Sequence, residues 1–325
     1  MALKTLTVVA GAALISSAVV HWQASRREAA AEAAYPPTGQ LVEVDGVKVH
    51  VHVEGDGPDL VLIHGASGNT REFTFQFVDR IKDRYRVFVV DRPGLGWTDR
   101  AGPGFGGALN VAAESPREQA RLLQRAVAEL GAVRPLVLGQ SYGGSVALAW
   151  ALEFPDAVSG LVIVSGASNP WPGGLNPIYP INASRTGASV VVPLLTAFAP
   201  RTGMDRVVGI IFAPQKAPEG YLDALGPGLS ARRASLRANA RQINSLKPHV
   251  IEMSKLYPSI DVPVEIIHGT ADEIVPLKIH SEPLAEAIPG AVLTRLEGIG
   301  HMPHHVAPEA VVDAIDRAAG RAALR

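Results

Sequence analysis

The chain has 325 residues, and 47% of them are hydrophobic, so it can bury a large core in one big domain or two small ones. Lysine and arginine number 30 against 31 for aspartate and glutamate, and this balance gives no basic surface for nucleic acid. There is no cysteine, which excludes disulfides, thiolate metal sites and a cysteine nucleophile.

The chain begins with an apolar run, Leu6 to Val20, with Lys4 before it and Arg26-Arg27 after it. The length of the run suits a signal-peptide core or a short membrane span. We predict a single N-terminal transmembrane helix within residues 1–24, which anchors the chain and holds the rest of it in the periplasm or otherwise outside the cytoplasm. The alternative is a cleaved signal and a periplasmic or secreted protein. Residues 25–39 are predicted to form a linker, because a short helical stretch there ends in prolines.

From residue 40 onward, short apolar runs alternate with helical patterns. Asp45-Gly46 lies between two β-rich runs, which is typical of an antiparallel hairpin. Later runs such as Leu60–Ile63 are apolar throughout, as in strands covered on both faces. The alternation predicts an α/β fold with a mostly parallel sheet and helices on both faces. Strands are expected at 40–44, 47–53, 60–63, 86–90, 136–138, 161–164, 264–267 and 292–296.

The alternation stops between residues 167 and 261, where prolines cluster and the helical pieces Val190–Phe198 and Val207–Phe212 occur. The segment leaves the core after one strand and returns at the next. We therefore predict a core of 40–166 and 262–325 with a lid, 167–261, over the sheet edge where ligands bind. The two apolar pieces could line a substrate pocket or pack within the lid.

A basic helix, Ser230–Leu246, lies within the predicted lid. Its arginines could hold an anionic substrate, but such a row is more often a solvated helix face, and we favour that interpretation. The residues concerned are Arg232, Arg233, Arg237 and Arg241.

A G-x-S-x-G pattern, Gly139 to Gly143, lies between the apolar strand 136–138 and a helix of small residues. Strand, tight turn and helix place Ser141 at the apex, in a strained backbone with its hydroxyl above the sheet edge. The first turn of the helix also directs free N–H groups at the serine.

A serine hydroxyl needs a base within hydrogen-bond reach, and the base needs an orienting carboxylate. Asp272 and His301 follow the last two predicted strands, on loops at the same sheet edge as Ser141. These three residues form the predicted catalytic set. Among the competing carboxylates, Asp261 precedes its strand and Glu265 lies inside it, and the neighbouring Glu273 is a poorer candidate than Asp272.

Two further histidines, His304 and His305, follow His301 closely. A metal cluster is conceivable there, but Pro303 and the lack of a nearby set of carboxylates argue against it. We expect both histidines to be polar residues near the mouth of the site. No metal and no cofactor are predicted.

Five motifs in this order resemble the α/β-hydrolase superfamily, over about residues 40–319. The resemblance implies an eight-stranded sheet with an inserted helical lid and an enzyme like the serine esterases and lipases. It also implies an oxyanion hole formed by the backbone N–H groups of Ala66 and Tyr142, and a structural role for Asp91 and Arg92. The motifs are His64-Gly65-Ala66, Asp91-Arg92-Pro93-Gly94-Leu95-Gly96, Gly139-Gln140-Ser141-Tyr142-Gly143-Gly144, Gly269-Thr270-Ala271-Asp272 with Val275-Pro276, and Gly300-His301-Met302-Pro303-His304.

The expected function is hydrolysis of a small-molecule carboxylic ester through an acyl-enzyme on Ser141. A serine at this position argues against epoxide hydrolases and haloalkane dehalogenases of this fold, which use aspartate there, and the absence of cysteine argues against dienelactone-type hydrolases. Met302 stands where meta-cleavage C–C hydrolases usually carry Trp. A C–C hydrolase and a cofactor-free haloperoxidase-like protein or perhydrolase stay open, as does a non-catalytic binding protein, although the complete triad argues against the last.

Overall fold

Eight strands form a single sheet in the order β1-β2-β4-β3-β5-β6-β7-β8. The computed structural model describes residues 2–324, with side chains from residue 15 onward. Only β1 and β2 run antiparallel to their neighbours, and all other pairs are parallel, so the predicted fold class is confirmed. The strands are β1 (Gln40–Val44), β2 (Val47–Glu54), β3 (Asp59–Ile63), β4 (Arg86–Val90), β5 (Leu136–Gln140), β6 (Gly160–Val164), β7 (Val264–Gly269) and β8 (Val292–Leu296).

The first two strands form the predicted hairpin. Val44 pairs with Val47, and the two residues between them, Asp45 and Gly46, have φ of 51° and 79°. Two consecutive positive φ values are what a two-residue turn needs to follow the twist of its strands. The Asp-Gly pair therefore fixes the register at this edge.

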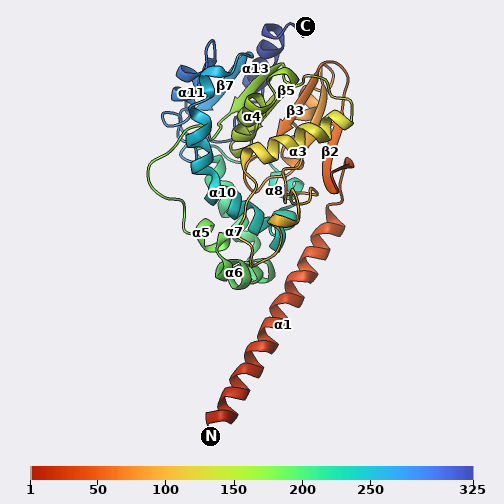
Figure 1. Ribbon diagram of the computed structural model, residues 1–325, viewed down its shortest axis with the longest axis vertical. Coiled ribbons are helices and arrows are strands. Elements are labelled where there is room, and N and C mark those ends of the chain that lie inside the picture. Colours follow the sequence, from red (N-terminus) through yellow and green to blue (C-terminus); the bar gives the residue numbers. More distant parts are fainter. Residues whose placement is uncertain (1, 325) are drawn as a thin grey trace.

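Helices cover both faces of the sheet, because alternate residues of the parallel strands point to opposite sides. Val61 and Ile63 belong to one apolar core, with α3 and α4, while Leu60 and Leu62 belong to the other, with α13. Figure 1 shows α3 and α4 in front of the strands. The helices of the α/β part of the chain are α2 (Arg71–Thr74), η1 (Val78–Arg80), η2 (Pro103–Phe105), α3 (Pro116–Glu129), α4 (Tyr142–Glu153), η3 (Pro155–Ala157), α11 (Ser281–Ala287), α12 (Pro303–Val306) and α13 (Pro308–Arg321).

The chain between β6 and β7 is helical and contributes no strand to the sheet. In Figure 1 its helices lie below the sheet, beside α1 (Ala2–Ala34). We call residues 167–261 the insertion. Its helices are α5 (Ile178–Ala183), α6 (Arg185–Phe198), α7 (Arg201–Phe212), α8 (Tyr221–Leu225), α9 (Pro227–Ser230), α10 (Arg233–Ser254) and η4 (Tyr257–Ser259).

The predicted membrane anchor is wrong. No helix among the residues that the structure describes is long and apolar enough to cross a membrane. The prediction that a transmembrane helix holds the rest of the chain outside the cytoplasm is therefore wrong as well. The side chains of residues 6–14, the first part of the apolar run, lie outside the described residues.

The second half of α1 packs against the insertion. Ala24 and Ala31 are buried, and a Cβ on Gly228 of α9 would come within 2.6 Å of the Ala31 side chain. Glu28 forms an ion pair with Arg233, with 2.6 Å between Oε2 and Nη2. Residues 25–34 of the predicted linker are therefore the end of a long helix, held by ion pairs and close packing.

The arginines of the basic helix are not a solvated face, so that prediction is wrong as well. None of the four is exposed. Arg232 pairs with Glu32 of α1 at 3.0 Å, Arg237 donates to the Ala188 carbonyl, and Arg241 donates to carbonyls of the loop before α3. These contacts join α1, α6 and the loop at Gly107-Ala108 to α10 and the residues just before it.

Candidate active site

Ser141 lies at the sharp turn between β5 and α4. Its φ of 53° and ψ of −119° are unusual for a residue with a side chain, so the backbone is strained there. The turn is possible because its glycines admit close approach: a Cβ on Gly139 would lie 2.2 Å from the Gly143 carbonyl oxygen, and one on Gly143 would lie 2.2 Å from that of Ile63. The G-x-S-x-G spacing is therefore a packing requirement of this turn.

The structure brings Ser141, His301 and Asp272 into one chain of hydrogen bonds. His301 Nε2 lies 2.9 Å from Ser141 Oγ, and His301 Nδ1 lies 2.7 Å from Asp272 Oδ2. His301 follows β8 and Asp272 follows β7, so three separate loops at one sheet edge supply the set. All three residues are at least nine-tenths buried.

The carboxylate of Asp272 is held by four donors. Oδ1 accepts the backbone N–H groups of Ile274 and Val275 at 2.9 Å, and Oδ2 faces His301 and also His268 at 3.1 Å. Burial alone would raise the pKa of Asp272, but the charge of His301 and the hydrogen bonds from His268 and His301 outweigh it and hold that pKa well below its usual range. The group is thus a fixed anion beside the imidazole.

The competing carboxylates do not reach His301. Glu273 and Asp261 are exposed. Glu265 is buried but forms ion pairs with Arg317 and Arg321 on α13.

The two residues expected to stabilise an oxyanion lie on either side of the nucleophile. Tyr142 is the first residue of α4, and Ala66 follows β3. A Cβ on Gly65 would come within 2.9 Å of the Ser141 Cβ, so the backbone before Ala66 passes directly beside the serine. In the described part of the chain, the amides of Ala66 and Tyr142 donate to no other group. Both N–H groups are therefore free to donate to a ligand oxygen.

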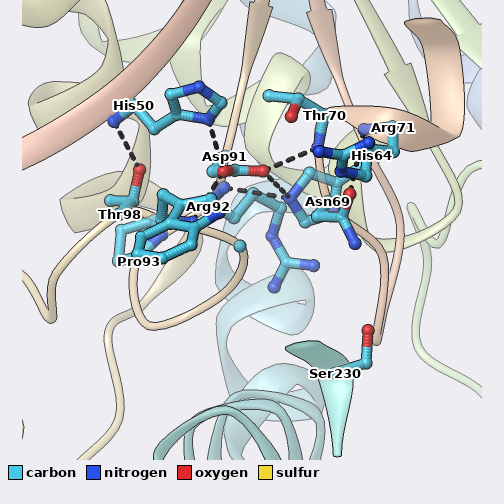
Figure 2. Close-up of polar contacts among 12 residues, drawn as sticks. His50, His64, Asn69, Thr70, Arg71, Asp91, Arg92, Pro93, Thr98 and Ser230 are labelled. Atoms are coloured by element: carbon cyan, nitrogen blue, oxygen red, sulfur yellow. Dashed lines mark hydrogen bonds and ion pairs between the residues drawn. The ribbon is translucent and has the colours of Figure 1, made fainter. Parts of the chain in front are cut away.

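The loop that carries Ala66 is fixed by a buried network around Asp91 (Figure 2). Asp91 Oδ2 pairs with His50 Nδ1 at 2.7 Å, and Oδ1 accepts the N–H of Thr70 at 2.6 Å. His64 Nε2 accepts the N–H of Arg92 at 3.0 Å, which leaves the His64 proton on Nδ1 to donate to the Gly65 carbonyl. Burial, followed by the charge of Arg92, lowers the pKa of His64 to about 4, so the ring is neutral at pH 7.

Arg92 is buried and connects this network to α4. Its guanidinium donates to the Gly65 carbonyl at 2.8 Å and stacks 3.8 Å from the centre of the Tyr142 ring. It also donates to Gln119 of α3 and Gln242 of α10. These contacts support the structural role expected for Asp91 and Arg92.

The insertion contacts the loops on both sides of Ser141. Asn239 of α10 binds Ser67, accepting its N–H at 2.8 Å. After α7, Gln215 accepts the N–H of Gly300 at 2.9 Å and donates to the Gly298 carbonyl at 2.8 Å, immediately before His301.

Both apolar pieces of the insertion have exposed as well as buried residues. Phe198, which we expected either to line a pocket or to pack within the lid, is 56% exposed, and Val190 and Val207 are also exposed. Phe212 is buried against Tyr221, with ring centroids 4.8 Å apart. In α6, Val192 and Ala197 are buried as well, so each piece has a buried side and an exposed side.

His304 and His305 do not lie at the mouth of a site as expected. Both side chains are almost fully buried, and both Nε2 atoms lie within 3.1 Å of Glu72 Oε1. Sequence reasoning missed Glu72, because 232 residues separate it from His304 and no motif contains it. The carboxylate that seemed to be lacking beside these histidines thus comes from α2.

Comparison with known proteins identifies the family of the chain. A model of the alpha/beta hydrolase family matches residues 60–314. The magnesium-chelatase 30 kDa subunit of Rhodobacter capsulatus is 31% identical over 261 residues, covering 78% of this chain and 84% of that protein. Haloalkane dehalogenase 2 of Mycobacterium tuberculosis is 26% identical over 286 residues, covering 86% and 94%. The solved structure of an esterase from Exiguobacterium antarcticum is 22% identical, with a TM-score of 0.67 over 86% of this chain and 99% of that one, which is a likeness of fold.

Proposed function

Because the chain belongs to the alpha/beta hydrolase family, we propose that it is a serine hydrolase of the esterase type, acting on a small-molecule carboxylic ester. The observation that carries the proposal is the continuous hydrogen-bond chain from Ser141 Oγ through His301 to Asp272, at 2.9 and 2.7 Å. A base within that distance is what activates a serine hydroxyl.

The proposed reaction has two halves. Ser141 Oγ attacks the ester carbonyl carbon while His301 Nε2 takes the hydroxyl proton, and the amides of Ala66 and Tyr142 donate to the oxyanion. The tetrahedral intermediate collapses when the alcohol leaves with the proton from His301. Water then attacks the acyl-enzyme by the same route, which releases the acid and restores Ser141. Asp272 keeps the imidazole in the tautomer with its proton on Nδ1.

Dehalogenation, the activity named for one relative, is not proposed here. Haloalkane dehalogenases of this fold carry an aspartate as nucleophile, and this chain has Ser141 in that place. A serine activated by histidine suits acyl transfer, in which the nucleophile adds to a carbonyl carbon.

We further propose that the insertion acts as a lid that selects the substrate. Two observations support this: Ser141 is only 9% exposed, and Asn239 and Gln215 bind the loops on either side of it. A substrate must reach the serine past these contacts. An apolar pocket discriminates by about 1–3 kcal/mol per methylene, so activity is expected to change gradually with ester chain length.

The test is labelling by a fluorophosphonate together with hydrolysis of p-nitrophenyl acetate and butyrate. Wild type should be labelled once and should hydrolyse at least one ester, and Ser141→Ala should lose both. Ser145→Ala is the matched control, since Ser145 is a buried serine of the same helix that donates to the Ala167 carbonyl instead. Absence of labelling and turnover in wild type would favour the non-catalytic binding protein, and labelling that survives Ser141→Ala would refute the nucleophile.

A further inference from the structure

A buried carboxylate with two imidazoles lies outside the proposed triad. Oε1 of Glu72, on α2, lies 3.1 Å from His304 Nε2 and 2.8 Å from His305 Nε2 and accepts a hydrogen bond from each. One donor atom of each of the three lies within 4.8 Å of those of the other two. The proposed reaction uses none of them.

A fourth polar group reaches the cluster from the insertion. Tyr221 of α8 donates its hydroxyl to Glu72, at 2.8 Å from Oε2. Aromatic rings surround the group: Phe73 lies 5.2 Å from the His304 ring and Phe212 lies 5.8 Å from the His305 ring, between centroids. The cluster is therefore a buried site with two nitrogen and two oxygen ligand atoms.

The charge of this cluster is unbalanced. In the part of the chain that the structure describes, no lysine or arginine forms an ion pair with Glu72, whose only ionic partners are the two histidines. A buried carboxylate without a cation is costly, even when it is hydrogen-bonded. A bound cation would remove that cost.

We propose that Glu72, His304 and His305 bind one divalent transition-metal ion, of which Zn²⁺ is the best match. Zinc takes four nitrogen and oxygen ligands at about 2.0–2.1 Å in a tetrahedron, which places ligand atoms about 3.3 Å apart. The separations between the two imidazole nitrogens and Glu72 Oε1, 3.1 and 2.8 Å, lie close to that value. Tyr221 or a water completes the fourth position.

Binding requires only that protons move within the imidazoles. In the metal-free site each Nε2 donates its proton to Glu72, and with the metal each Nε2 lone pair binds the ion while the proton moves to Nδ1. Nothing in the described chain bonds to His304 Nδ1, so no partner fixes the proton on the other nitrogen. The ion takes the place of two N–H···O contacts on the carboxylate.

The position of the site indicates what the ion does. α2 follows the loop of Ala66, α12 follows His301, and α8 belongs to the insertion. An ion held at their junction would fasten these three segments to one another, at a distance from the reacting serine. Its expected effect is on stability, which separates this proposal from the proposed esterase function.

The experiment measures metal content and thermal stability of the full chain. After treatment with EDTA, incubation with ZnCl₂ and dialysis, wild type should retain one zinc per chain by elemental analysis. At a concentration 100 times the dissociation constant, zinc should raise Tm by about 3–5 °C. With CoCl₂ the same site should give the visible absorption of tetrahedral rather than hexahydrated cobalt.

Glu72→Gln and His305→Asn should each abolish retention of the metal and the Tm shift. The matched control is the double variant His52→Asn and Glu54→Gln, because these two side chains form a similar but more exposed pair, with 3.3 Å between Nε2 and Oε2. The control should retain zinc like wild type. If wild type retained no metal, the proposal would be overturned even if the variants failed to fold. It would also be overturned if Glu72→Gln retained as much zinc as wild type, or if the control variant lost its zinc.

Discussion

Replacing the carboxylate of Asp272 by an amide tests the proposed mechanism most sharply. In Asp272→Asn, Oδ1 can keep the N–H groups of Ile274 and Val275, so the loop should retain its shape. The amide NH₂ then takes the place of Oδ2, which lies 2.7 Å from His301 Nδ1. Two donors cannot face each other, so the His301 proton must move to Nε2. An Nε2 that carries a proton cannot accept one from Ser141.

The expected loss in kcat is about 10⁴-fold, equivalent to about 5 kcal/mol of transition-state stabilisation. KM should change little, because Asp272 does not contact the substrate in the proposed mechanism. Initial rates on p-nitrophenyl acetate, with the free energy of unfolding measured alongside, give both quantities.

The control is Glu273→Gln. This substitution removes the same charge from the next residue, whose side chain is exposed. It should retain wild-type kcat. If Asp272→Asn kept more than a tenth of kcat, or if both variants lost activity equally, the role assigned to Asp272 would be refuted.

Three further outcomes follow from packing and charge. Gly143→Ala should destabilise the fold by about 3 kcal/mol in urea unfolding, because its Cβ would lie 2.2 Å from the Ile63 carbonyl; a wild-type midpoint would refute the tight turn. His64 is protonated near pH 6.5 when unfolded but near pH 4 when folded, so the unfolded state gains its proton first as pH falls. Because of His64, the free energy of unfolding should fall by about 2 kcal/mol between pH 7 and pH 5. The variant His64→Asn should not show this part of the fall. Glu28→Gln should weaken the contact with Arg233 by about 1 kcal/mol and speed tryptic cleavage in the second half of α1, and unchanged cleavage would argue against the contact.

The features set by local pattern could be predicted from the sequence. Continuously apolar runs such as Leu60–Ile63 correspond to strands buried on both faces. Ser115 and Glu118, three positions apart as a capping box requires, form one at the start of α3. The parallel order of the strands explains why loops far apart in the chain meet near Ser141.

Features that depend on a distant partner could not be predicted. The row of arginines resembled a solvated face because its partners, such as Glu28 and Glu32, lie about two hundred residues earlier. Glu72 could likewise be identified as part of a cluster only once the fold placed it beside His304 and His305. The anchor was predicted from a short apolar run, but α1 continues without a break from that run into charged residues.

The attachment of α1 to the insertion has a consequence for how the chain is made. Glu28 lies 205 positions before its partner Arg233. At a synthesis rate of about 5–20 residues per second, the ribosome needs about 10–40 s to deliver that partner. Until the insertion has been synthesised, α1 lacks the helices against which it packs. The nascent helix is then open to chaperones and proteases, and the order of synthesis makes the first segment of the chain one of the last to reach its final contacts.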